Sequence, residues 1–203
     1  MRVCRHILLA ILLLALVSLA VWCYLCREPL RRQWLLYRIG AAVTSREAEA
    51  EIVRCETDPD PNAMIGDLVD KWGTGNHQFD LHLASHLDAP SCGDSLRQAF
   101  AEEIGGRPEL LQRWAHFWSW RSPLPLDEQT ASVVTYLDTV AADPSRTITW
   151  REVLDVQALF ELTGRGELAR GLSPSDWRDR YREWQRRRPA KLPNHPRPKT
   201  PFP

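Results

Sequence analysis

The amino-acid sequence predicts an all-α protein: one N-terminal transmembrane helix, a compact domain of stacked helical hairpins and a disordered proline-rich C-terminal tail. Two observations support this prediction. Residues 7–26 form a run of apolar and small residues without a charged side chain. Beyond this run, apolar residues recur every three or four positions between capping residues and glycine or proline stops, and sustained alternation of apolar and polar residues is absent.

The uncharged run has the length of a membrane-spanning helix, since about twenty apolar residues cross the hydrocarbon core. Aromatic side chains stand at its end, where they favour the headgroup region, and arginines follow. The predicted membrane-interface residues are Trp22, Tyr24, Arg27, Arg31 and Arg32. We therefore predict a short N-terminal flank and a single-pass anchor over residues 1–26, with the lipid bilayer as a partner.

A cleaved signal peptide is the alternative interpretation of this segment. Arg2 and Arg5 would form its charged region, and residues 18–20 would offer a small-x-small cleavage site. The apolar run exceeds the usual length of a signal core and continues past Ala20, which favours an uncleaved anchor. Arginines following the run slightly outnumber those before it, so we predict a cytoplasmic body on a plasma (inner) membrane. The excess of arginine over lysine favours a bacterial source.

The remaining chain divides into a juxtamembrane basic and aromatic segment at residues 27–43, a helical domain at 44–188 and a proline-rich tail at 189–203. The domain opens with a capping-box pattern, Thr44 followed by Glu47. A second helix is expected from Pro61, after Asp60, to the glycines of residues 73–75.

Later helices are predicted from apolar stripes and their boundaries. Three helices are expected from the stripes Phe79–Leu83–Leu87, Leu96–Phe100–Ile104 and Leu110–Trp114–Trp118. Two more are expected from their boundaries: one over residues 127–142, and one that is capped by Thr149 and ends near Gly164. The order helix, Asp-Pro turn, helix, glycine occurs twice, at residues 46–73 and 131–164, which suggests stacked hairpins.

The last predicted helix has an aromatic stripe, Trp177, Tyr181 and Trp184, among many arginines. Such a helix can lie on anionic lipid, or its stripe can dock on the body while the arginines stay solvated. We favour docking. The tail after it is rich in proline and should be extended or disordered.

Charge is unevenly distributed, although the net charge is zero. Residues 44–143 contain seven basic and eighteen acidic side chains, whereas basic residues exceed acidic ones at both ends of the chain. One basic helix beside so acidic a body does not favour a nucleic-acid partner.

The histidine-rich stretch His77–Cys92 is the candidate for metal chemistry. His82 and His86 are four residues apart, so a helix places them on one face, as a two-histidine site requires. His77, Asp80 or Cys92 could supply a third ligand, with Asp88 a further possibility. Both histidines also border the predicted core stripe, and histidines in that position are commonly only hydrogen-bonded. We therefore expect no bound cofactor, with a divalent metal as the alternative.

The cysteines are open to several interpretations. Cys23 and Cys26 fit apolar packing at the end of the anchor, with acylation, or a disulfide between the anchors of two chains, as the alternatives. Cys55 and Cys92 could pair in an oxidising compartment and should be reduced in the cytoplasm.

Phosphate-binding glycine loops, dinucleotide fingerprints and nucleophile elbows are absent from the sequence, so no motif predicts an enzyme. We predict a membrane-anchored helical interaction or scaffold protein that binds another protein. The alternative is a membrane-tethered metal-dependent enzyme that uses the His77–Cys92 stretch.

Overall fold

The computed structural model describes the backbone of residues 2–188, and the side chains in this range except those of residues 2–11, 23 and 25. Over these residues the chain is helical with no strand, which confirms the predicted all-α class. The helices are α1 (Arg2–Ala41), α2 (Ser45–Glu56), α3 (Pro61–Lys71), α4 (His77–Asp88), α5 (Asp94–Gly106), α6 (Pro108–Trp120), α7 (Leu126–Ala142), α8 (Trp150–Leu162), the 3-10 helix η1 (Gly166–Ala169) and α9 (Trp177–Arg187). The predicted proline-rich tail, residues 189–203, lies outside the described residues.

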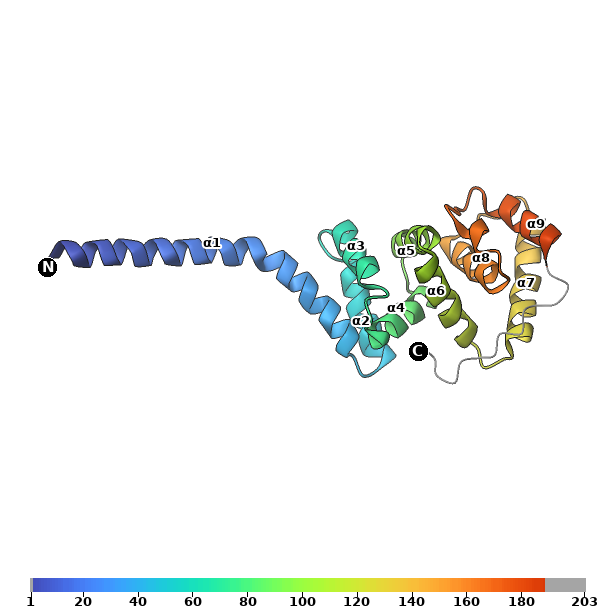
Figure 1. The fold of residues 1–203 in the computed structure, drawn as a ribbon, viewed down its shortest axis with the longest axis horizontal. Helices are drawn as coiled ribbons and strands as arrows, with labels where there is room; N and C mark the ends of the chain where they lie inside the picture. Colours follow the sequence, from blue (N-terminus) through green and yellow to red (C-terminus); the bar gives the residue numbers. More distant parts are fainter. Residues whose placement is uncertain (1, 189–203) are drawn as a thin grey trace.

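Helix α1 has two parts with different environments. Its N-terminal part projects away from the rest of the chain as a single rod (Figure 1), and apolar side chains from Leu12 to Trp22 are exposed there. Its C-terminal part packs against α2, α3 and α4. Leu35, Leu36 and Ile39 are buried in the same core as the body, although they precede the predicted domain start at residue 44.

No single described helix is long and apolar enough to cross a membrane. Two consecutive parts of α1, Leu12–Trp22 and Cys26–Ala41, meet the length and composition requirements together, with a bend of 48° between them. Pro29 lies within the second part.

The arginines that follow the apolar run contact acidic side chains of the body. Arg31 lies 3.5 Å from Asp58, in the α2–α3 connection. Arg32 lies 3.8 Å from Asp60 and 3.6 Å from Asp67 of α3. In the structure, these two predicted membrane-interface residues therefore attach α1 to the domain.

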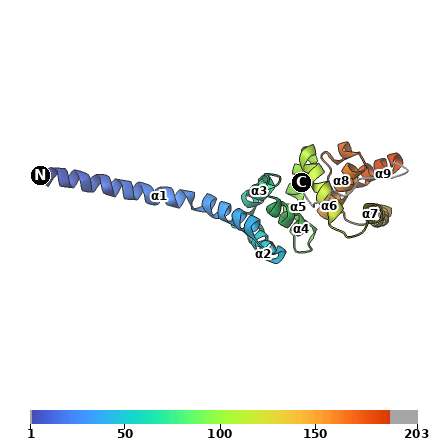
Figure 2. The same cartoon turned by 60° about the horizontal axis from the view of Figure 1, so that its bottom comes forward.

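The body extends from α1 in successive groups of helices, and the two views agree on this order (Figures 1 and 2). Helices α2, α3 and α4 lie beside the C-terminal part of α1, α5 and α6 follow, and α7 and α9 lie at the far end. Helix α8 packs against α5, α6, η1, α7 and α9, so it is the centre of the second half. Gly105 allows close packing there, because a Cβ atom would meet the Ala169 carbonyl oxygen at 2.9 Å.

The predicted helix starts are confirmed by their capping contacts. Thr44 and Glu47 form a capping box at α2, and Thr149 and Glu152 form one at α8. Asp60 accepts a hydrogen bond from the Ala63 amide, with Pro61 at the first position of α3. These side chains satisfy amide groups that the first helical turn leaves without partners.

The aromatic stripe of α9 docks on the body, as the sequence predicts. Trp177, Tyr181 and Trp184 are fully buried. The Trp177 indole donates a hydrogen bond to the Glu152 carbonyl oxygen (3.2 Å), and the Trp184 indole donates to the Thr163 hydroxyl (2.8 Å). The aromatic surface is buried and both indole N–H groups have hydrogen-bond acceptors. Helix α9 is therefore part of the domain core.

Candidate metal centre

Helix α4 places His82 and His86 one turn apart, but their side chains have different neighbours. The His82 Nε2 atom lies 3.1 Å from the Ala42 carbonyl oxygen and 2.9 Å from the Gln78 amide nitrogen. His82 therefore attaches α4 to the residue that follows α1. The structure does not bring His82 and His86 together in one site.

Most of the predicted third ligands lie away from His86. Asp80 is fully buried, lies 2.6 Å from Arg113 of α6 and accepts a hydrogen bond from the Gly73 amide (3.1 Å). His77 is exposed at the start of α4. Asp88 lies 2.8 Å from Arg121 and lines a surface hollow beside α4, not the surroundings of His86. Of the proposed third ligands, Cys92 is the one that lies beside His86.

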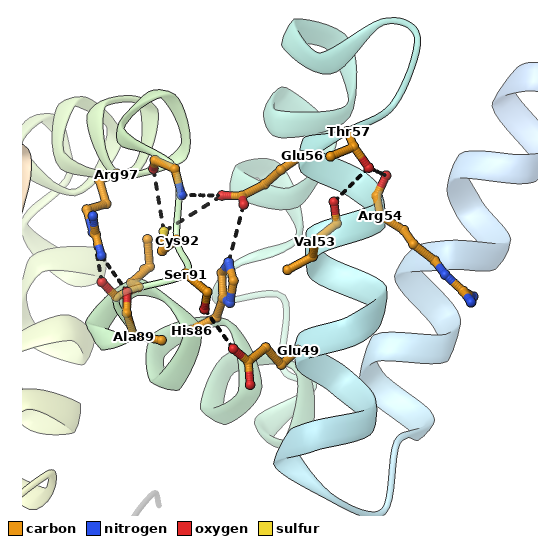
Figure 3. Close-up of polar contacts among 12 residues, drawn as sticks. Glu49, Val53, Arg54, Glu56, Thr57, His86, Ala89, Ser91, Cys92 and Arg97 are labelled. Atoms are coloured by element: carbon orange, nitrogen blue, oxygen red, sulfur yellow. Dashed lines mark hydrogen bonds and ion pairs between the residues drawn. The ribbon is translucent and has the colours of Figure 1, made fainter.

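A third side chain completes this group from another helix. Glu56, the last residue of α2, points toward His86 of α4 and toward Cys92 in the α4–α5 connection (Figure 3). One ligand atom from each residue lies within 4.8 Å of the other two. The His86 Nε2 atom is 3.5 Å from Glu56 Oε2, and the Cys92 Sγ atom is 3.7 Å from Glu56 Oε1.

The group is largely shielded from solvent. The His86 side chain is 1% exposed and that of Glu56 is 13% exposed. Among the described residues, the Nδ1 atom of His86 has no hydrogen-bond partner, and the Nε2 atom has only the contact of 3.5 Å with Glu56 Oε2. The contact with Glu56 is longer than the usual hydrogen bond of about 2.7–3.2 Å, so this buried imidazole is held only weakly by its neighbours.

The three groups differ in their protonation. Burial by itself raises the pKa of Glu56, but contacts from His86, the Gly93 amide and Cys92 outweigh it and lower that pKa below its ordinary value of 4.5. Burial raises the pKa of the Cys92 thiol to about 12, despite the opposing effect of Arg97. Without a bound cation, the group therefore consists of a carboxylate and a protonated thiol around the imidazole.

The surrounding residues hold this group in place. The Gly93 amide donates to Glu56 Oε1 (3.0 Å), and the Ser91 hydroxyl donates to Glu49 (2.7 Å). Arg97 of α5 donates to the carbonyl oxygens of Leu87 and Ala89 (Figure 3). The α4–α5 connection is thus fixed against both α2 and α5.

Sequence reasoning found His86 and Cys92 but not Glu56. Glu56 belongs to a charged helix end 30 residues before His86, and no periodicity within one helix relates the two positions. Cys55, the other buried cysteine among the described residues, is not part of this group and packs in the apolar core. Cys55 and Cys92 are both free thiols in the structure.

Two surface hollows lie near α6, and both include Arg121. One has a volume of about 340 Å³ and is lined by residues of α7 and α8, among them Tyr136 and Arg151. The other, of about 370 Å³, lies beside α4 and includes His82 and Asp88. Arg121 lies 3.0 Å from the carboxylate of Asp155, which also accepts a hydrogen bond from the Trp118 indole (2.8 Å).

Comparison with known proteins gives no match: no family model, curated protein or solved structure is similar to this chain.

Proposed function

We propose that the chain is a single-pass membrane-anchored protein whose helical domain is an interaction or scaffold module for another protein. The observation that supports it most is the composition of α1. Its N-terminal part exposes a continuous apolar surface, whereas its C-terminal part contributes to the core of the domain.

An exposed apolar rod favours the membrane as its environment. Leu13, Leu14 and Leu16 have exposed fractions of 59%, 72% and 57%, as expected of side chains that face lipid rather than a protein core. The body has few large exposed apolar side chains by comparison, such as Leu124 and Tyr136. Lipid contact is therefore proposed for α1 and not for the body.

Membrane fractionation tests the anchor. We expect the full chain to remain in the membrane pellet after alkaline carbonate extraction. The double substitution Leu13→Arg/Leu16→Arg should release it, because each arginine costs about 2.5–3.5 kcal/mol at the centre of a spanning helix. Leu124→Arg is the matched control in the body and should stay in the pellet. Recovery of a chain whose N-terminus lies near Ala20 would instead establish a cleaved signal peptide.

The polar hollows near Arg121 support the interaction role. They have the size of ligand-binding clefts, and their charged side chains are held by ion pairs rather than left free. Arg121 also lies over the Trp118 ring, 4.7 Å from its centroid, so the guanidinium has a fixed position. A partner with polar and charged groups would meet a prearranged surface here.

Native mass measurement of the detergent-extracted chain tests the interaction. We expect a complex heavier than the chain alone, reduced in amount by Ser132→Trp, which fills the hollow beside Tyr136. Thr139→Trp is the control, on an exposed position of the same helix outside this hollow. A sample that contains only the single chain under mild extraction would contradict the proposal.

The second candidate function is a membrane-tethered metal-dependent enzyme, and the observation in its favour is the convergence of Glu56, His86 and Cys92. A catalytic metal needs a position open to substrate. The three side chains are nearly enclosed and line neither hollow described above. Hydrolytic activity that depends on added metal and is lost in His86→Gln, but not in His82→Gln, would establish this alternative.

A further inference from the structure

We infer that Glu56, His86 and Cys92 form a structural zinc site, which joins the C-terminal end of α2 to α4 and to the α4–α5 connection. This inference is independent of the proposed function, because none of the three residues belongs to α1 or to the hollows near Arg121.

The spacing of the ligand atoms fits tetrahedral zinc. With metal–ligand distances of about 2.0–2.3 Å, neighbouring N, O and S ligands of such a site stand about 3.4–3.6 Å apart. The two oxygens of Glu56 each approach one partner: Oε2 lies 3.5 Å from His86 Nε2, and Oε1 lies 3.7 Å from Cys92 Sγ. The remaining separation, between His86 and Cys92, is at most 4.8 Å. Because one oxygen, one ring nitrogen and the sulfur all lie within 4.8 Å of one another, side-chain shifts of about 1 Å bring these three atoms to tetrahedral ligand spacing.

The buried imidazole supplies a second, independent observation. His86 is 2% exposed, and its Nε2 atom points toward Glu56 at a distance too long for a strong hydrogen bond (Figure 3). A cation between the two residues would replace this long contact with a direct bond to the ring nitrogen.

The chemistry and charge of the ligand set also fit zinc. Imidazole, thiolate and carboxylate are all ligands of Zn²⁺, whereas Mg²⁺ and Ca²⁺ prefer oxygen alone. Binding forms a Zn–S bond as the thiol proton leaves to solvent, so that the ion is neutralised by one thiolate and one carboxylate. A buried centre without net charge avoids the cost of an uncompensated ion. The neighbouring Arg97 is already occupied by carbonyl oxygens of the α4–α5 connection.

The position of the site indicates a structural role. Glu56 lies at the end of α2, and Cys92 lies in the connection that precedes α5, where the cap residue Gly93 has no side chain to satisfy amide groups. A metal bond between these segments would fix a connection that the apolar core covers only in part. Three protein ligands leave a fourth tetrahedral position for water, as in catalytic zinc sites. Here the ligands are nearly enclosed, which closes that position to a substrate and favours the structural role.

Cobalt titration of the full chain in detergent tests the site, with a tag that lacks histidine. We expect one Co²⁺ to bind per chain and a thiolate-to-cobalt charge-transfer band to appear in the near ultraviolet. Added Zn²⁺ should displace the Co²⁺, and the band should then disappear. Cys92→Ser should abolish the band, and His86→Gln or Glu56→Gln should weaken binding by at least about 10- to 100-fold, the loss typical even of residues that only support a ligand. Cys55→Ala and His82→Gln are the matched controls, a buried thiol and a neighbouring histidine outside the group, and should bind as the unaltered chain does.

Two results would overturn the inference: a folded chain that shows no thiolate–cobalt band, or a band that survives Cys92→Ser and disappears in Cys55→Ala. Folding of each variant is checked by its cooperative thermal unfolding without metal. If Cys92→Ser does not fold, the site is tested instead by the thermal unfolding of the unaltered chain. Added Zn²⁺ should then raise its unfolding temperature, because an ion that binds only the folded state stabilises it. An unchanged unfolding temperature would refute the site.

Discussion

Arg31 on α1 lies 3.5 Å from Asp58 in the α2–α3 connection, and the Asp58 side chain is only 3% exposed. Its Oδ1 atom accepts a hydrogen bond from the Asp60 amide, while Oδ2 has no hydrogen-bond partner among the described residues. The Arg31 guanidinium is therefore the charge that compensates this carboxylate. Arg31 itself is 45% exposed, so solvent screens part of the attraction.

Arg31→Gln should lower the free energy of unfolding by about 1–2 kcal/mol, because it leaves a buried carboxylate oxygen without its cationic neighbour. Chemical unfolding of the detergent-solubilised chain measures this loss. Arg27→Gln, an exposed arginine one turn earlier, should change the free energy by less than about 0.5 kcal/mol. Equal effects of the two substitutions would show that the Asp58 contact adds nothing beyond general charge.

A fragment of residues 44–188 should fail to fold, whereas a fragment of residues 27–188 should unfold cooperatively. The shorter fragment lacks Leu35, Leu36 and Ile39, which are buried in the body. Each buried aliphatic side chain contributes about 1.5–3 kcal/mol, and their sum is comparable to the stability of a typical domain. Circular dichroism and thermal unfolding compare the two fragments. Cooperative unfolding of the shorter one would show that α1 is dispensable for the core.

Trp184→Ala should destabilise the domain by about 3–5 kcal/mol, the usual cost of removing a fully buried indole. The substitution also leaves the Thr163 hydroxyl without the indole that donates to it. Urea unfolding followed by far-ultraviolet circular dichroism provides the measurement. Arg186→Ala, on the exposed side of the same helix, is the control and should be nearly neutral. A neutral Trp184→Ala would mean that α9 does not depend on its aromatic stripe.

Glu152 should stabilise the domain at neutral pH and not in acid. Burial alone raises its pKa, but hydrogen bonds from Thr149 and Tyr136 outweigh burial and lower the pKa below 4.5. A carboxyl whose pKa is lower in the folded state contributes stability above its unfolded pKa, and this contribution is lost as the pH falls through the folded value. Glu152→Gln should therefore cost about 2 kcal/mol at about pH 7 and progressively less below about pH 4.

Thermal unfolding of both chains across this pH range checks the prediction. Glu167→Gln, an exposed position in η1, serves as the control. A difference between Glu152→Gln and the unaltered chain that stays constant down to pH 3 would contradict the lowered pKa.

The thiols of Cys55 and Cys92 should resist labelling in the folded chain. Both are buried, and burial raises the pKa of each to about 12, so little reactive thiolate is present. Val43→Cys, at a position 87% exposed, should react rapidly and would report the side of the membrane on which the body lies. An impermeant maleimide applied to intact and lysed cells makes both measurements. Both measurements use a chain in which Cys4, Cys23 and Cys26 are replaced by serine. Fast labelling of this folded chain without Val43→Cys would refute the first expectation.

The sequence was sufficient to predict the helices because their signals are local. Thr44, Asp60 and Thr149 cap the helices that their spacing predicts, and the stripe Trp177–Tyr181–Trp184 is buried as expected. Each of these signals lies within about one helical turn, where backbone hydrogen bonding sets the geometry.

Contacts between helices were harder to predict. Periodicity identifies which residues share a face of one helix but not which helix lies opposite that face. The pairing of Glu56 with His86, and that of Arg31 with Asp58, depend on how α2, α4 and α1 pack together. For the same reason, His82 and His86 share a predicted face yet contact different segments.

Helix α1 continues from Arg2 to Ala41 through its bend of 48°, and this continuity has a rotational consequence. Because one helix contains both the exposed apolar part and the part packed on α2, the orientation of the body about the α1 axis depends on the number of residues between them. Inserting one residue before Leu35 would turn the body by about 100° and displace it by about 1.5 Å, whereas inserting four would restore nearly the original facing, about 6 Å farther along the axis. If α1 anchors the chain in a membrane as proposed, a partner in that membrane would meet the body at a fixed rotation about the α1 axis. Binding should then vary with insertion length with the period of the helix.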